Sequence, residues 1–251
     1  MKRSHPTADK NAADAVLPDT ESESVMKVRI RFSKTGALVY IGHLDVMRYF
    51  QKLFVRSGIP VAYSEGFSPH QLLSFTPPLP LGMESTGEYA DVVLTKSITT
   101  KEAIMHLHKQ SVDGIYISSF RALPEKCENA MASVKAARYT VKACMSDAQK
   151  RINDFLSKEE ALVIKRSKKS EKTINLRPLV YELCVDPANN DIEMLISSGS
   201  TDNIKPELVM SALFGEQADT FAEKDLIIKR LDQYTVVDDF VSLDDIGQVI
   251  K

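Results

Sequence analysis

The chain has 251 residues, 43% of them hydrophobic, and a formal net charge of −2 at pH 7. This length and composition predict a globular protein with a sizeable core and exclude a wholly disordered chain. No apolar run is long enough to span a membrane, and the polar N-terminus has no apolar signal core, so we expect a cytoplasmic protein without a membrane contact.

The first half of the chain predicts alternating strands and helices. Residues 1–25 are polar and acidic and predict a disordered tail. Val28, Ile30 and Phe32 alternate with basic residues, a period of two that predicts a half-buried strand. An amphipathic helix follows and stops at Gly58. Further strands are predicted at residues 59–64, 87–97 and 114–124, and a second helix, capped by Thr99 or Thr100, at residues 99–111.

This β-α-β-β-α-β order is that of the ferredoxin-like unit, and a similar order recurs after residue 135. Strands are predicted there at residues 138–146, 160–167, 176–186, 191–200 and 227–237, and helices at residues 147–159 and 205–215. We therefore predict an α+β fold of two ferredoxin-like βαββαβ modules in tandem, at residues 26–125 and 136–237. Residues 238–251 are expected to form an acidic tail or a short amphipathic helix.

The chain carries no metal or cofactor motif of its own. Cys127, Cys144 and Cys184 are far apart and fit no zinc, CxxC or iron–sulfur spacing, so we expect three unpaired thiols. The histidines include no HExxH arrangement. We predict no metal site and no cofactor.

Several motifs resemble those of one family. They are FSKTG at the end of the first strand, GHLD at the start of the first helix, SEGFSPH, LPLG with Glu84 and Ser85, and LRPLVYEL. Together they resemble the radical-SAM-linked domain family, a domain of unknown function that stands alone or is fused behind a radical SAM enzyme domain. This chain lacks the CxxxCxxC that would hold a [4Fe–4S] cluster, so the resemblance implies a separate radical SAM enzyme as partner.

The loop-rich segment at residues 63–85 is the first candidate binding surface. Glycines and prolines stiffen it, and a rigid loop loses less entropy when it holds a ligand. The alternative is that the segment only shapes an irregular crossover while Phe67, Leu72 and Phe75 fill the core. The candidate binding residues of this segment are Glu65, Gly66, Phe67, Ser68, Pro69, His70, Gly82, Glu84 and Ser85.

Two histidines form an alternative, catalytic candidate. His43 opens the first helix, where the positive end of the helix dipole disfavours the imidazolium and suits a general base. With His70 it could cleave a phosphodiester without a metal. The competing interpretation is a histidine that only caps the helix or is held by hydrogen bonds.

Basic residues suggest RNA as a ligand, although the near-neutral total charge excludes a protein coated with positive charge. The first strand would present them on an open sheet face, and the first helix and a lysine-rich turn add more. The alternative is ordinary surface charge, with Arg29 or Arg31 paired to Asp91 on a neighbouring strand. The basic candidates are Arg29, Arg31, Arg48, Lys52, Lys168, Lys169 and Arg177.

From these features we expect a non-catalytic module that binds RNA, such as tRNA or rRNA, or presents a substrate to a separate radical SAM enzyme. A metal-independent ribonuclease that uses His43 and His70 is one alternative. A protein–protein adaptor is the other.

Overall fold

The computed structural model describes residues 25–142, 147–166, 171–199, 202–214 and 226–251. The tail predicted to be disordered therefore lies outside the described residues, except for Val25. Cys144, Lys168 and Lys169 also lie outside them, whereas Cys127 and Cys184 are free thiols.

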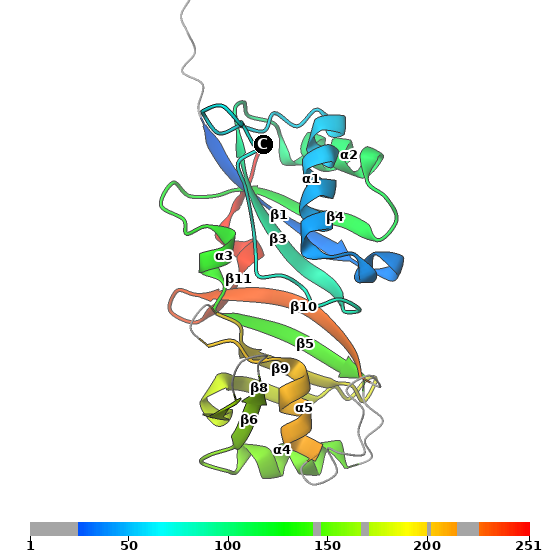
Figure 1. Ribbon diagram of the computed structural model, residues 1–251, viewed down its shortest axis with the longest axis vertical. Coiled ribbons are helices and arrows are strands. Elements are labelled where there is room, and N and C mark those ends of the chain that lie inside the picture. The colour runs from blue at the N-terminus through cyan, green and yellow to red at the C-terminus, as the bar shows by residue number, and fades with distance from the viewer. Residues whose placement is uncertain (1–24, 143–146, 167–170, 200–201, 215–225) are drawn as a thin grey trace, which may run out of the picture.

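The described residues form a mixed α+β structure, as predicted (Figure 1). The α-helices are α1 (His43–Ser57), α2 (Thr100–Gln110), α3 (Ala130–Ser133), α4 (Ala148–Leu156) and α5 (Pro206–Phe214). The strands are β1 (Met26–Lys34), β2 (Leu73–Phe75), β3 (Glu84–Leu94), β4 (Ile115–Ala122), β5 (Ala136–Lys142), β6 (Leu162–Arg166), β7 (Glu171–Asn175), β8 (Val180–Val185), β9 (Ile192–Ser197), β10 (Ile227–Val236), β11 (Phe240–Ser242) and β12 (Gln248–Val249). Short 3₁₀ turns lie at η1 (Gly36–Tyr40), η2 (Arg177–Leu179) and η5 (Leu243–Ile246).

One large sheet runs through the molecule in the order β12-β4-β1-β3-β10-β5-β9-β8. β2 pairs with β3, β11 pairs with β10, and β6 and β7 form a separate hairpin. The two halves of the chain meet where β3 and β10 run parallel, at Glu84 with Lys229 and Ser85 with Arg230. Backbone hydrogen bonds therefore join the two predicted modules edge to edge.

Each half has its own apolar core. Between α1, α2 and the strands β1, β3 and β4 lie Ile30, Phe50 and Phe120, all fully buried. The second core lies among α4, α5, β5 and β9. Figure 1 shows the α1–α2 pair and the α4–α5 pair at opposite ends of the long axis. Helix α1 buries Phe50 because residues four apart share one helix face, and it ends at Gly58, whose φ of 67° suits a residue without Cβ.

Three local predictions need correction. The strand predicted at residues 59–64 makes only isolated bridges, at Val61 and Tyr63, because Pro60 has no N–H to donate to a ladder. No strand was predicted at residues 171–175, which form β7 and pair with β6. In place of a C-terminal helix, η5 is a single 3₁₀ turn between β11 and β12, and these strands pair with β10 and β4.

The sheet face that carries Arg29 and Arg31 is not open, contrary to the prediction. Arg29 is 2% exposed and its guanidinium donates to the carboxylate of Asp91, 2.7 Å from Nε to Oδ1. It also reaches the Glu128 carbonyl and the Ser133 hydroxyl beside α3. Arg31 is 25% exposed and contacts Asp232 and Asp244. Helix α3 and the η5 turn cover this face. The two arginines therefore form contacts within the fold and are not presented to a ligand on an open sheet.

Candidate functional site

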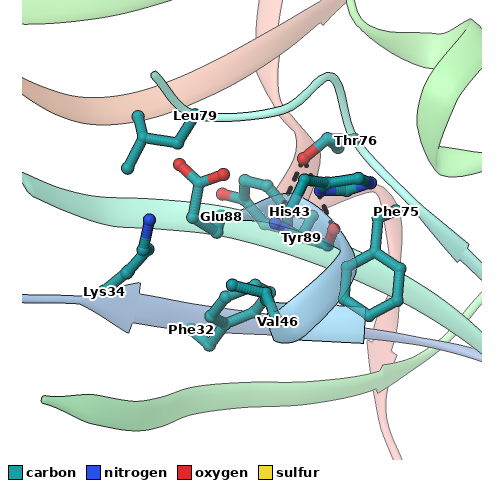
Figure 2. A pocket seen from close by; sticks show the side chains of 9 residues that line it. All are labelled: Phe32, Lys34, His43, Val46, Phe75, Thr76, Leu79, Glu88 and Tyr89. Carbon is teal, nitrogen blue, oxygen red and sulfur yellow. Dashed lines mark hydrogen bonds between the residues drawn. The ribbon is translucent and has the colours of Figure 1, made fainter. Parts of the chain in front are cut away.

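A pocket lined by Lys34, called the Lys34 pocket below, lies on the helix-covered side of β1 and β3 (Figure 2). Its volume is about 20 Å³. Apolar side chains from β1, α1 and the segment around β2 form its walls, and polar groups converge between them. The lining residues are Phe32, Lys34, His43, Val46, Phe75, Thr76, Leu79, Glu88 and Tyr89.

Lys34 is a buried cation at the end of β1, 3% exposed. Its ammonium donates to the carbonyl oxygens of Val39, at 3.3 Å, and Ile41, at 3.0 Å. Burial lowers the pKa of Lys34, because the charged form loses its hydration, and the charge of Glu88 acts in the opposite direction. Strand alternation places Lys34 on the same face as Val28, Ile30 and Phe32, so the apolar face of β1 ends in a charge.

Glu88 is the cross-strand partner of Phe32 and is 6% exposed. The guanidinium of Arg230 on β10 holds its carboxylate through two hydrogen bonds. Arg230 is 2% exposed and pairs in register with Tyr139 on β5. The pair Glu88–Arg230 therefore connects the pocket to the second half of the chain.

His43, the first residue of α1, is partly exposed and its ring lies edge-on against Phe75, 5.9 Å between ring centroids. Burial lowers the pKa of His43, the charge of Glu88 raises it, and the charge of Lys34 lowers it further. The imidazole is therefore disposed to be neutral, as its position in the first turn predicted, although burial is the leading cause.

Behind the pocket, on the other sheet face, a second network surrounds Tyr89. Its hydroxyl donates to the carboxylate of Asp232, which also accepts from Ser242 on β11 at 2.8 Å. Burial, followed by the charge of Asp232, raises the pKa of Tyr89. The C-terminal segment is held to the sheet by this network.

A second concavity, called the α1 groove below, lies between α1 and the loop at residues 63–71. It is lined by Gln51, Lys52, Val55, Arg56, Tyr63, Pro69, His70 and Gln71. The loop closes through Tyr63 and Gln71, which form an isolated bridge. Its shape is fixed at His70, whose Nδ1 lies 2.8 Å from the Ser64 hydroxyl.

The structure separates the two histidines of the catalytic alternative. His43 lines the Lys34 pocket, His70 lines the α1 groove, and the two cavities share no residue. Arg48 is exposed and pairs with Asp45 at 3.3 Å, one turn before Lys52.

The remaining loop candidates scatter over three places. Glu65, Gly66, Phe67, Ser68 and Pro69 are exposed around the loop tip, with Gly66 at a φ of 105°. Glu84 accepts a hydrogen bond from the Gly36 backbone at 3.3 Å, and Gly82 donates to the carbonyl of Val39. Ser85 is fully buried and accepts from the Gly87 backbone, so Glu84, Gly82 and Ser85 brace the η1 turn and β3.

Arg177 lies far from both cavities along the chain. Its guanidinium donates to the Leu156 carbonyl at 3.4 Å, from η2 to the end of α4. This contact links two elements of the second half.

The residues predicted from the sequence did not include Lys34, Glu88 or Arg230. A signal existed for the first two, because each continues an apolar strand face: Lys34 follows Phe32, and Glu88 precedes Ala90 and Val92 at the same spacing. Arg230 gave no such signal, since its partner lies 142 positions away.

Within the part of the chain that the structure describes, no three His, Cys, Asp or Glu side chains gather as a metal would require. No helix there is long and apolar enough to cross a bilayer.

The motifs that carry the family resemblance contribute to the Lys34 pocket: Lys34 closes FSK, His43 begins HLD, and Glu88 belongs to the GEY that follows LPLG. No curated protein matches the chain. One family matches residues 27–206, more than half of the chain, and is described as an uncharacterized protein conserved in bacteria. The chain therefore belongs to this bacterial family, DUF2344.

Proposed function

We propose that the chain is a non-catalytic module that binds single-stranded RNA in the α1 groove. The observation that carries the proposal is the composition of its two walls. One wall is the basic side of α1, and the other is a rigid loop with exposed aromatic rings. Sites for single-stranded nucleic acid usually combine positive charges along the sugar–phosphate backbone with aromatic rings on which the bases stack.

The basic wall is formed by Lys52 and Arg56, one helical turn apart, with Arg48 a turn earlier. Among the described residues, no carboxylate forms an ion pair with Lys52 or Arg56, although Arg56 lies 6.0 Å from the centroid of the Tyr49 ring. Charges without a competing carboxylate are available to phosphates, and each phosphate neutralised releases counterions from the RNA.

The loop wall supplies stacking surfaces and one free acceptor. Tyr63, which lines the groove, is 52% exposed, and Phe67, outside the groove lining at the loop tip, is fully exposed. Gln71 is 8% exposed, and its side-chain N–H donates to the Gln51 carbonyl and the Tyr63 hydroxyl, whereas its Oε1 has no hydrogen-bond partner. That oxygen could accept from the amino group of a base after a small adjustment of the loop.

Fluorescence anisotropy with a labelled single-stranded RNA tests the proposal. Lys52→Glu with Arg56→Glu should weaken binding by about tenfold or more and flatten its salt dependence. Phe67→Ala should weaken binding by about threefold or more and leave the salt dependence unchanged. Lys150→Glu with Lys158→Glu makes the same charge change at exposed positions, one in the first turn of α4 and one just after the helix, and should bind as the wild type does.

The proposal fails if the wild type does not bind RNA at low salt. It also fails if the RNA affinity falls by the same factor in the groove variant and in the α4 variant. Such a result would mean that RNA binds to positive charge anywhere on the surface and not to the α1 groove. In either case the adaptor interpretation becomes the better one.

The proposed partner is a separate radical SAM enzyme, to which the module would present its RNA. The motif resemblance supports this partner, and the absence of a CxxxCxxC motif from the chain is consistent with it. The metal-independent ribonuclease is not favoured, because His43 and His70 line different cavities.

We also infer that each half is a ferredoxin-like module. The strand order β4-β1-β3-β2 in the first half and β10-β5-β9-β8 in the second supports this interpretation. The β6–β7 hairpin would then be an insertion into the second module.

A further inference from the structure

We propose that the Lys34 pocket binds the terminal oxyanion of a small ligand, a carboxylate or a phosphate, between the Lys34 ammonium and the first turn of α1. This site is separate from the RNA proposal, because the pocket and the α1 groove share no lining residue. The proposal stands on the cavity, a buried cation without a carboxylate partner, and the helix end beside it.

The charge of Lys34 is buried and has no acidic partner among the described residues. The residue is 3% exposed, and no carboxylate that the structure describes lies within 4.0 Å of its ammonium. The nearby Glu88 is already held by Arg230. An ammonium has three N–H donors, and two of them are used on the carbonyls of Val39 and Ile41. One N–H donor of the ammonium therefore remains for an anion.

The N-terminus of α1 adds a second positive group to the pocket. The first N–H groups of a helix have no acceptor within it, and Gly42, at the N-cap, has no side chain to supply one. His43 and Val46, both from the first turn, line the pocket. The positive end of a 15-residue helix thus lies beside the buried ammonium. Asp45 belongs to the same turn, but its carboxylate is 62% exposed and pairs with Arg48.

Of the nine residues that line the pocket and are drawn in Figure 2, His43 is the one that is partly exposed, whereas the other eight are buried. A neutral imidazole can donate one hydrogen bond to an anion. A bound anion would also stabilise the imidazolium and offset the burial that lowers the pKa of His43. Occupancy should therefore be readable from the titration of this ring.

The size of the pocket limits what can enter it. A volume of about 20 Å³ admits little more than one oxygen atom, since one water needs roughly 10–15 Å³. Only the terminal oxygens of a ligand can enter, and its remaining atoms must lie outside, beyond His43. The walls of Phe32 and Phe75 keep the local dielectric low, which strengthens attraction between the anion and Lys34.

The test is a titration of ¹⁵N-labelled full-length protein followed by NMR, with inorganic phosphate in one arm and acetate in the other. Ionic strength is held constant with chloride. In at least one arm, we expect saturable shifts of the His43 and Leu44 amide signals and a rise in the pKa of the His43 ring. The arm that saturates at lower concentration identifies the chemistry of the group.

Lys34→Gln should weaken this binding by about tenfold or more, while Lys101→Gln on exposed α2 should leave it unchanged. If Lys34→Gln does not fold, His43→Leu takes its place, with an expected loss of about threefold or more. Shifts that never saturate, shifts spread over the basic surface, or the absence of any shift at the start of α1 in both arms would overturn the proposal. Equal affinity in the pocket variant and the Lys101 control would do the same.

Discussion

Arg29 on β1 and Asp91 on β3 are direct cross-strand partners and form an ion pair in which each side chain is 2% exposed. The sequence allowed two interpretations of Arg29, a phosphate contact or a partner of Asp91, and the structure supports the second. A buried pair contributes little when intact, because desolvation offsets its attraction. Loss of Arg29 would leave the buried carboxylate of Asp91 with only the partly exposed ammonium of Lys27, 3.5 Å away, as an ion-pair partner.

We therefore expect Arg29→Met to lower the free energy of unfolding by about 3–5 kcal/mol in urea denaturation. The double change Arg29→Met with Asp91→Leu should recover much of that loss, since both charges leave together. Arg48→Met removes an exposed pair and should cost about 0.5 kcal/mol or less. A cost for Arg29→Met no larger than that for Arg48→Met would contradict this account.

Gly87 is expected to determine how closely β10 packs beside β3, where the two halves of the chain meet. A Cβ at this position would lie 2.5 Å from both the Cα of Asp232 and the carbonyl oxygen of Leu231 on β10. Gly87→Ala must push β10 away from β3 and should cost about 1–3 kcal/mol or more in thermal or urea unfolding. Gly199→Ala is the control, because its nearest contact would be 3.5 Å away and its cost should be small. Equal stability of the two variants would show that β3 and β10 can move apart without a loss of stability.

Thr99 is the N-cap of α2, and its side chain accepts from the Glu102 backbone while Glu102 accepts from the Thr99 backbone. Thr99→Ala should lower the free energy of unfolding by about 1 kcal/mol. Ser97→Ala, at an exposed position before the helix, should be close to neutral. If both changes have the same effect, the capping box does not stabilise α2 in solution.

His43 should make stability depend on pH in a defined window. Its folded pKa lies below 6.5, chiefly through burial, so between that value and 6.5 the unfolded chain binds more protons than the folded chain. The stabilising contribution is therefore present above pH 6.5 and is lost as the pH falls through the folded pKa.

The measurement is urea denaturation of the wild type and His43→Leu at about pH 7.5 and about pH 5. We expect the wild type to lose more stability than the variant over this interval, because leucine has no proton to gain. A loss that is the same in both proteins would place the pH dependence on other groups.

Much of the local structure was predictable because it rests on neighbouring residues. The helix α1, its stop at Gly58, the cap of α2 and the strands β8 and β9 follow from periodicity and turn chemistry. The prediction of a strand at residues 59–64 was wrong because the backbone path there depends on β3 and on Pro60. The prediction that Arg29 and Arg31 lie on an open sheet face was wrong, because α3 and η5 cover that face and are far from β1 in the sequence.

The sequence by itself determined the α+β class, the absence of a cluster motif and the family resemblance, because each depends on residue types at short spacing. Only the tertiary structure decided that His43 lies with Lys34 and Glu88 while His70 lies in another cavity. It also decided that Arg230 neutralises Glu88, through a parallel strand contact across 142 positions. Such contacts depend on which strands become neighbours, and the periodicity of a single strand does not specify its neighbour.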